Sequence, residues 1–422
     1  MNMQAKPTPT AAEAALVEAF TERLSDLPGD AAVMVRRDDA VERIKAGLPN
    51  RRVEAWHYTD LRRLLAAVPD FDPAVKLAPL APLVEGSTVL ATLNGVGAAA
   101  APAVDGVTFG RLPDMLADGS FAPALQPQDA ADAIGAINVA FVADGHFVEI
   151  DEDAVVERPI ELQNLMGTGQ SHVRFPVRVG ARARATIVER QAGDAAGFTT
   201  SVSNVTVGDG AELTWVIVQE ETAGANYLGQ FNATIGKDAK LTLFIMNAGG
   251  KLVRQEVRVA AEGEECEFRL RGVNLLAGDT HCDVTMVLDH LGYGATSTEI
   301  VRNIVLDKAQ GVFQGQIRVA REAQKTDAKM ACNTLLLSDE GEFSIKPELE
   351  IFADDVACGH GATVAEIDGN HLFYLMARGV PEKEARGLLV KAFLAEVIEE
   401  LTDEALVEAL EQRLDGWFAE HG

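Results

Sequence analysis

The sequence is poor in cysteine and in basic residues, and it has no long hydrophobic run. Its four cysteines lie 16, 50 and 26 residues apart with no C-x-x-C pair, which argues against a disulfide framework and against a local zinc or iron–sulfur ligand set. No apolar stretch approaches the ~20 residues that span a bilayer. The N-terminal stretch lacks the basic start and apolar core of a secretory signal. We therefore expect a cytoplasmic protein.

The deficit of basic residues also limits the partners. Acidic residues outnumber basic ones by 64 to 37, which gives a net charge of -27. A chain with this charge repels nucleic acid and anionic membranes, so neither is expected as a partner. The nucleotide-binding pattern G-x-x-x-x-G-K-[ST] and the hydrolase patterns H-E-x-x-H and G-x-S-x-G are absent. The common signatures of nucleotide, zinc-protease and serine-hydrolase chemistry are therefore missing.

A 28-residue repeat organises the middle of the chain. Gly180, Gly208 and Gly236 keep this interval, and each lies between two β-type runs. Strands that repeat without intervening helices favour a β-helix of about seven turns. A β-sandwich with coincidental spacing is the alternative. The three clearest copies are VRVGARARATIVE (177–189), VTVGDGAELTWVI (205–217) and ATIGKDAKLTLFI (233–245).

The repeat predicts core residues. If one copy is one turn, Val179, Val207 and Ile235 should stack in register and face inward. At 422 residues the chain is too long for one compact core, and helical patterns flank the repeat on both sides. We expect these helices to cap the two ends of the solenoid. The predicted units are a helical domain over 1–85, a β-helix over 86–375 that is regular from about residue 170, and a helical domain over 376–422.

Each flanking region has its own helix signals. Thr10 and Glu13 form a capping-box pattern in front of an apolar run. Pro381 suits a first helical turn, and Asp403 begins the final helix. The apolar stripe of the C-terminal helices either packs on the β-helix or receives a partner, and packing is the favoured reading.

The stretch THCDVTMVLDH concentrates metal-type donors. On a strand, His281, Asp283 and Asp289 would share one face while Cys282 and His290 share the other. A metal site is one interpretation. The favoured interpretation pairs the histidines with aspartates on a solvated strand face.

A second stretch, IFADDVACGHGATV, places Cys358 and His360 two residues apart. On a strand both would point to one face, about 6.5 Å apart, and thiolate and imidazole suit iron or zinc. Two ligands cannot complete a four-coordinate site, so a partner chain or the substrate would supply the rest. The alternative is a buried thiol beside a turn histidine. Cys266, Cys282 and Cys332 are expected to be buried structural residues.

Several motifs, in the same order along the chain, resemble the SufB/SufD family of iron–sulfur cluster assembly proteins. The length and the short C-terminal tail are similar to the SufD side of the family. His57 departs from a usual lysine, and Gly359 from a frequent serine. The motifs are EAWHYTDL (54–61), GVFQGQIRV (311–319), AQKTDA (323–328), KPELEIFADDVACGHGATV (346–364) and LFYLMARGV (372–380), with NVAFVADG (138–145) as a weaker match.

The resemblance implies a right-handed parallel β-helix between two helical domains, and a non-catalytic scaffold subunit of the SufBCD complex. Such chains pair with SufB through the end of the β-helix and bind the SufC ATPase through C-terminal helices, here residues 381–422. His360, beside Cys358, would act with a SufB thiolate on the nascent cluster and would be a metal ligand shared with that partner.

The same resemblance sets the cofactor expectations. The isolated chain should bind no cofactor tightly, while the complex would carry a transient iron–sulfur cluster and support iron acquisition. Reduced flavin in the complex and a homodimer of the isolated chain are further expectations.

Two other functions stay open. A carbohydrate-active β-helix enzyme would need clustered carboxylates and aromatic sugar platforms, but aromatic residues make up only 6% of the chain. A purely structural β-helix would carry the Cys358 and His360 motif by coincidence. Trp56 and Tyr58 are interpreted as a packing anchor rather than as ligands.

Overall fold

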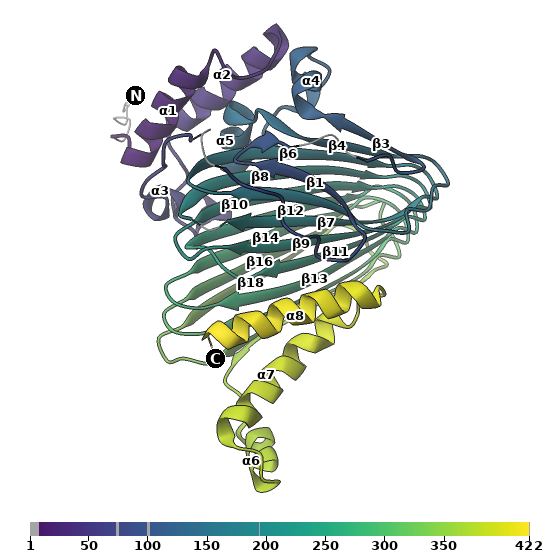
Figure 1. Ribbon diagram of the computed structural model, residues 1–422. Helices are drawn as coiled ribbons and strands as arrows, with labels where there is room; N and C mark the ends of the chain where they lie inside the picture. Colours follow the sequence, from purple (N-terminus) through teal and green to yellow (C-terminus); the bar gives the residue numbers. More distant parts are fainter. Residues whose placement is uncertain (1–7, 73–75, 99–101, 194, 422) are drawn as a thin grey trace, which may run out of the picture.

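A parallel β-helix forms the centre of the molecule (Figure 1). The computed structural model describes residues 8–72, 76–98, 102–193 and 195–421. From β4 to β19 the strands alternate between two sheets, so these sixteen strands, two to a turn, make eight turns. The predicted β-helix is therefore confirmed, with one turn more than the repeat indicates.

The two sheets, A and B, run the length of the solenoid and are parallel except for pairings at the N-terminal end, where β2 and β3 are antiparallel to their neighbours. Sheet A contains β1 (Thr88–Leu93), β2 (Val96–Gly97), β5 (Ile160–Met166), β7 (Arg184–Gly193), β9 (Glu212–Glu221), β11 (Lys240–Asn247), β13 (Glu267–Leu276), β15 (Thr296–Val305), β17 (Asp327–Leu336) and β19 (Ala357–Ala365). Sheet B contains β3 (Val107–Arg111), β4 (Asp144–Ile150), β6 (Gly169–Val179), β8 (Gly197–Val207), β10 (Asn226–Ile235), β12 (Leu252–Ala261), β14 (His281–His290), β16 (Gln310–Val319) and β18 (Glu342–Ile351).

In-register pairing stacks equivalent residues of successive turns. Val179 pairs with Val207, and Val207 pairs with Ile235. All three side chains are buried in the apolar interior, so the predicted stack is confirmed. Burial of one such side chain is worth roughly 1.5–3 kcal/mol, and each turn adds a further set.

The glycine that follows the strand in each copy of the repeat is required by the close approach of neighbouring turns. A Cβ atom at Gly208 would lie 2.8 Å from the carbonyl oxygen of Val179 and 2.9 Å from the backbone nitrogen of Ala181. The Gly208 N–H donates to that same carbonyl oxygen at 2.9 Å. A side chain here would break the contact between turns, which explains the regular spacing of the glycines.

A ladder of amide side chains runs through the interior of sheet A. Asn247 donates to Asn274 at 2.7 Å, and Asn274 donates to Asn303 at 2.7 Å. Asn303 then donates to the hydroxyl of Thr334 at 3.0 Å. Each of these amides donates to the next one in register, so the ladder pairs most of its buried polar groups, with the Asn247 Oδ1 left over, and it favours one strand register.

The N-terminal helices cover the outer face of sheet B, and they form a core with its residues Phe198, Val202 and Leu228. The predicted capping box at Thr10 and Glu13 is present. Helices α4 and α5, from the range predicted as β-helix, belong to this same core, and the domain boundaries stay predictions. The elements are α1 (Ala11–Arg23), α2 (Ala31–Ala46), η1 (Glu54–Trp56), α3 (Leu61–Leu64), α4 (Leu112–Ala117), η2 (Ala122–Ala124) and α5 (Ala133–Phe141).

The C-terminal helices are α6 (Gly369–Ala377), α7 (Glu382–Ile398) and α8 (Glu404–His421). The apolar stripe of α7 and α8, including Leu394 and Leu410, packs on the outer face of sheet A against Val216 and Phe244, so the favoured packing interpretation is confirmed. Pro381 is the N-cap of α7, one position before the first-turn position predicted for it. No helix in the described residues is long and apolar enough to cross a membrane.

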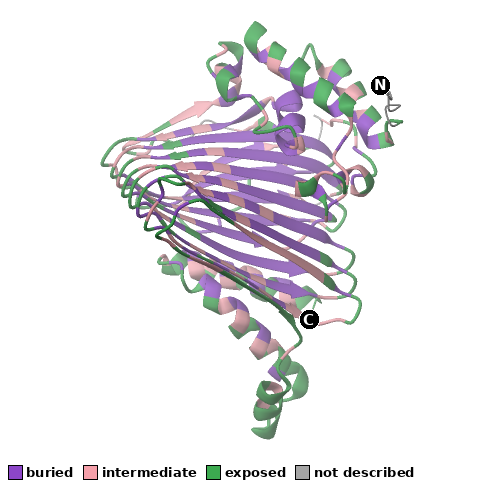
Figure 2. Cartoon of the chain, turned by 180° about the vertical axis from the view of Figure 1, so that it is seen from behind, coloured by how far each residue is buried: buried purple, intermediate pink, exposed green. Residues whose placement is uncertain are grey.

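The last turn of the solenoid is left open, contrary to the expectation that helices cap the ends. β18 and β19 are the final strands of their sheets, and neither contains a fully buried residue (Figure 2). The helices cover the outer faces of the sheets because those faces carry apolar side chains as well. The open last turn therefore exposes interior positions and unpaired strand edges together.

We predict that Glu221→Gln makes the protein more stable at alkaline pH. Glu221 is buried without a hydrogen-bond partner for either carboxyl oxygen, and burial raises its pKa to about 8. Between its ordinary value of 4.5 and 8, the folded chain keeps this proton while the unfolded chain loses it. Stability therefore falls as pH rises through that window, by about 1.4 kcal/mol for each pH unit within it.

Thermal unfolding at pH 5, 7 and 9 measures this effect. The loss of Tm between pH 5 and pH 9 should be smaller in Glu221→Gln than in the wild type. Glu408→Gln, at an exposed position on α8, is the control and should behave as the wild type. An unchanged pH dependence in Glu221→Gln would contradict the assignment.

Candidate functional site

Cys358 and His360 lie on β19, the last strand of sheet A. The predicted common face is present, and the alternative of a turn histidine is wrong, because residues 357–365 are a continuous strand. Cys358 is in register with Ala328, and His360 is in register with Met330. Both of these partners are buried in the interior, so Cys358 and His360 extend interior columns into the open last turn.

The open end makes both side chains accessible. Cys358 is half-buried and His360 is exposed. The Ala357 N–H donates to Thr326 on the preceding loop, so the odd-numbered residues of β19 direct their backbone groups towards β17. The even-numbered residues, Cys358 and His360 among them, therefore present backbone N–H and C=O groups at the free edge. A partner strand can pair with this edge and reach the two side chains at once.

The two side chains differ chemically. Partial burial raises the pKa of the Cys358 thiol, and the nearby charges of Asp327 and Glu299 raise it further. The thiol is therefore protonated at neutral pH and a poor metal ligand in the free chain. His360 offers an imidazole, which is a suitable ligand for iron.

The other three cysteines are structural, as predicted. Cys266, Cys282 and Cys332 are buried. Burial raises the pKa of Cys266 to about 11 and that of Cys332 to about 12, and it raises the pKa of Cys282 strongly as well. Buried thiols of this kind stay protonated and unreactive.

Two stretches that are far apart in the sequence meet on the outer face of sheet B. The Thr59 hydroxyl lies 2.9 Å from Nε2 of His281 and also bonds Asp283. Arg254 bonds Asp283, and its guanidinium lies 3.8 Å above the ring of the buried Trp56. The expected solvated face at His281 and Asp283 is wrong, because the N-terminal helical layer buries both side chains.

The remaining expectations for these two stretches have mixed outcomes. The packing-anchor interpretation of Trp56 is confirmed by its complete burial, while His57 is exposed. Cys282 and His290 face inward, and the His290 Nε2 lies 3.1 Å from the Ser297 hydroxyl. No group of three or more His, Cys, Asp or Glu side chains that could hold a metal ion occurs within the described ranges. The metal interpretation of residues 280–290 therefore has no support.

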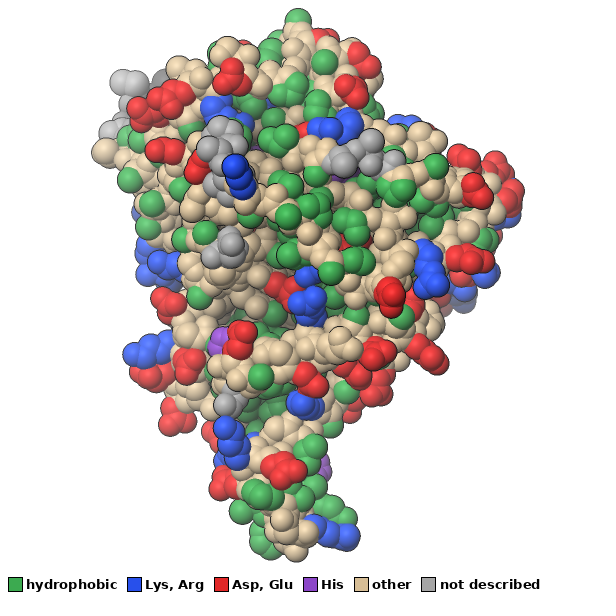
Figure 3. Space-filling view, viewed as in Figure 1, with side chains coloured by type: hydrophobic (Ala, Val, Ile, Leu, Met, Phe, Trp, Pro, Cys, Tyr) green, Lys and Arg blue, Asp and Glu red, His purple; other side chains and the backbone are tan. Residues whose placement is uncertain are grey.

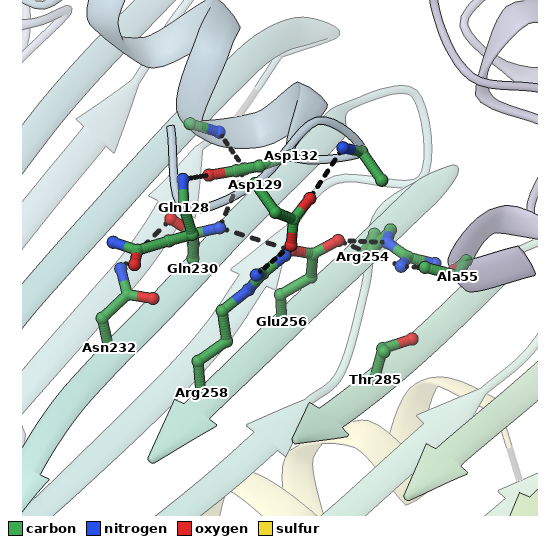
Figure 4. Close-up of polar contacts among 12 residues, drawn as sticks. Ala55, Gln128, Asp129, Asp132, Gln230, Asn232, Arg254, Glu256, Arg258 and Thr285 are labelled. Carbon is green, nitrogen blue, oxygen red and sulfur yellow. Dashed lines mark hydrogen bonds and ion pairs between the residues drawn. The ribbon is translucent and has the colours of Figure 1, made fainter. Parts of the chain in front are cut away.

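A charged layer next to this anchor had not been predicted. Arg258 bonds Asp129 at 2.6 Å and Glu256 at 3.2 Å, while Gln230 bridges Asp132 and Glu256 (Figure 4). Burial and the charge of Glu256 raise the pKa of Asp132, which also caps α5. The sequence signal for this layer is the alternation of the charged residues Arg254, Glu256 and Arg258 along one strand. The polar groups of this layer pair with one another, and in doing so they attach the segment in front of α5 to the outer face of sheet B.

Comparison with known proteins identifies the family to which this chain belongs. Residues 163–393 match the SufBD core domain of SUF-system FeS cluster assembly. The chain belongs to the SufBD core family. It is 29% identical to the iron–sulfur cluster assembly protein SufD of Escherichia coli K12, over 88% of this chain and 89% of that protein. It is 28% identical to the chloroplastic protein ABCI7 of Arabidopsis thaliana, over 95% of this chain and 90% of the relative.

A third relative is a SufBD family iron–sulfur cluster assembly protein of Synechocystis, 29% identical over 68% of this chain and 66% of that protein. The matched SufBD core runs from β5 into α7 and includes Cys358 and His360. None of these relatives is a carbohydrate-active enzyme, so the alternative function has no support.

The protein has two further surface features, a groove beside α8 and an apolar surface on α6. A groove of about 1020 Å³ lies between the end of α8, at Arg413 and Trp417, and the glycine-rich turns around Gly193, Gly249 and Gly278 (Figure 3). It contains neither Cys358 nor His360.

The second feature is an apolar surface on the projecting helix α6, which has no buried residue (Figure 2). Phe373 is 72% exposed and Tyr374 is 57% exposed, and Met376 and Leu388 lie exposed nearby on α6 and α7. We call these four residues the α6 patch. Large exposed apolar side chains of this kind are typical of protein-binding surfaces.

We predict that Trp56→Ala loosens the N-terminal layer while the β-helix stays folded. Loss of a buried tryptophan typically costs about 3–5 kcal/mol, and here it also removes the support of Arg254. Hydrogen exchange should become faster in α1 and α2, with the amides of β10 to β17 unchanged. His57→Ala, at the exposed neighbouring position, is the matched control; equal exchange in the two variants would show that Trp56 is not the anchor.

Proposed function

We propose that the protein is the SufD-type scaffold subunit of an iron–sulfur cluster assembly complex, without catalytic activity of its own. The observation that carries this proposal is the open last turn, which combines two free strand edges with Cys358 and His360. The family membership and the names of the relatives support the same function. We further propose that the protein acts in the cytoplasm.

The partner at the open end is SufB in this proposal. A second β-helix that docks end to end would pair its own edge with β19 and cover the half-buried side chains of β18. Ile345 and Leu349 of β18 already pack partly against the interior core, so docking would complete a core that the chain alone leaves unfinished. In the absence of SufB, a second copy of this chain could occupy the same edge as a homodimer.

We call the proposed contact between β19 and the SufB strand the seam. Iron is the cargo there. The imidazole of His360 supplies one ligand, and a SufB thiolate supplies another across the seam. Cys358, protonated in the free chain, lines the seam beside His360 and becomes a ligand only if the partner lowers its pKa. The chain thus contributes to a transient iron–sulfur cluster and to iron acquisition, and reduced flavin would act in the complex.

The SufC ATPase would bind the C-terminal helices, within residues 381–422 and the adjoining helix α6. The apolar stripe that suggested this surface is buried against sheet A and cannot be the contact. The α6 patch remains exposed and is the part of this region that can receive a partner. We therefore assign SufC binding to the α6 patch together with the exposed side of α7.

We predict that His360→Ala abolishes cluster formation in the assembled complex, whereas Cys358→Ala keeps much of it. The imidazole is exposed at the open end and suits iron, while the thiol is held protonated. The measurement is anaerobic reconstitution with SufB and SufC, followed by iron and sulfide analysis, with gel filtration to show that both variants assemble. Normal clusters in both variants would reject the role of this motif.

We predict that Phe373→Asp weakens SufC binding at least tenfold and leaves SufB pairing intact. A charge at the centre of an apolar contact must be buried without a partner, which costs more than about 1.4 kcal/mol, the equivalent of tenfold. Val155→Asp is the matched control, because Val155 is also exposed but lies on the β-helix. Pull-down and calorimetry measure both interactions; unchanged SufC affinity in Phe373→Asp would move the contact elsewhere.

A further inference from the structure

One interior column of sheet A ends at His360. Glu299 on β15 is in register with Met330 on β17, and Met330 is in register with His360 on β19. The carboxyl group therefore lies two strands below the open end, about 10 Å from the position of His360. Glu299 is fully buried, and neither of its carboxyl oxygens has a hydrogen-bond partner in the part of the chain that the structure describes.

A buried, unpaired carboxyl group is costly, so its position calls for an explanation. A fully desolvated carboxylate is strongly unfavourable without a countercharge, and such a group stays protonated instead. Burial raises the pKa of Glu299 to about 8, against the opposing influence of Ser297 and Arg271. The charge of Glu299 also reaches the open end, because it raises the pKa of Cys358.

The surroundings of Glu299 supply no free countercharge. Arg271, on β13, has its guanidinium bonded to Thr298, to the backbone oxygen of Leu270 and to Glu400 at 2.5 Å. His290, on β14, bonds Ser297, and burial lowers its pKa to about 4, so it is neutral.

The remaining groups around Glu299 bear no charge that could offset it. Cys358 and His360 on β19 lie towards the open end. Besides His290 and Ser297, the interior residues around the carboxyl group on β14 to β17 include the apolar Met286, Ile317, Val301 and Met330.

We propose that Glu299 is a positioning residue for the metal-binding end: its carboxyl group, once ionised, supplies a negative charge beneath a cation held at His360. This inference rests on the proposed role of His360 in holding iron. On ionisation the carboxyl O–H bond breaks and the proton passes to a water molecule or buffer base at the open end. The O–H bond forms again as the pH falls, and no electrons are transferred.

The chain offers a matched control for this proposal. Glu221 is also buried on the inner side of sheet A, both of its oxygens lack partners, and burial raises its pKa to about 8 as well. It lies on β9, however, five strands from β19 in sheet A. Glu221→Gln therefore removes an equivalent carboxyl group at a distance from which its charge is ineffective at the open end.

The test uses the full-length chain and ferrous iron under anaerobic conditions. Cys358 is half-buried and the other three cysteines are buried, so iodoacetamide labelling, read by mass spectrometry, reports on the open end. The quantity measured is the iron concentration that halves the labelling rate of Cys358, at pH 6.5 and pH 8.5. His360→Ala shows whether this protection depends on the proposed ligand.

We expect Glu299→Gln to need about tenfold more iron than the wild type at pH 8.5, where the wild-type carboxyl group is charged, and an equal amount at pH 6.5. Glu221→Gln should match the wild type at both pH values. If Glu299→Gln equals the wild type while His360→Ala abolishes protection, the inference is wrong and the proposed function stands. An equal rise in the iron concentration needed by Glu299→Gln and by Glu221→Gln would also overturn the inference. If iron gives no protection in the wild type, both the inference and the iron-holding role of His360 fail.

Discussion

The hydrogen bonding between successive turns is the constraint on which the rest of the structure depends. Each turn supplies the edge that the next turn needs, so the solenoid can satisfy every internal strand but not its last two. The helical layers do not solve this problem, because they lie on the outer faces of the sheets. In the proposed function, a strand of SufB pairs with the edge of β19 that the chain alone leaves unpaired.

Much of the fold could be predicted because it is periodic. The glycine spacing reports a backbone contact that recurs in every turn, as at Gly208, and the same spacing predicts the stack of Val207 on its neighbours. The position of the helices was not predictable in this way. Outward residues such as Phe198 and Phe244 alternate with inward ones, so their pattern does not tell which faces of the solenoid another layer covers.

The candidate site was accessible to sequence reasoning only in part. Cys358 and His360 are two residues apart, so a strand brings them together without any knowledge of the fold. The contact between Thr59 and Asp283 joins residues more than two hundred positions apart, and no local pattern indicates it. Glu299 looked like an ordinary acidic residue, since its significance comes from the register of three strands in the folded solenoid.

The amide ladder inside sheet A stops one strand short of the end. Thr334 receives its last bond, and the next residue in that column is Val364, whose side chain cannot continue it. Besides its backbone pairing with β17, the final strand has a side-chain bond from Asn333 to Thr363, which lies where water can compete for it. A slip of one residue would turn His360 to the opposite face. In the proposed assembly only one alignment of β19 places the imidazole of His360 at the contact with the partner strand, so pairing with that strand would select this alignment.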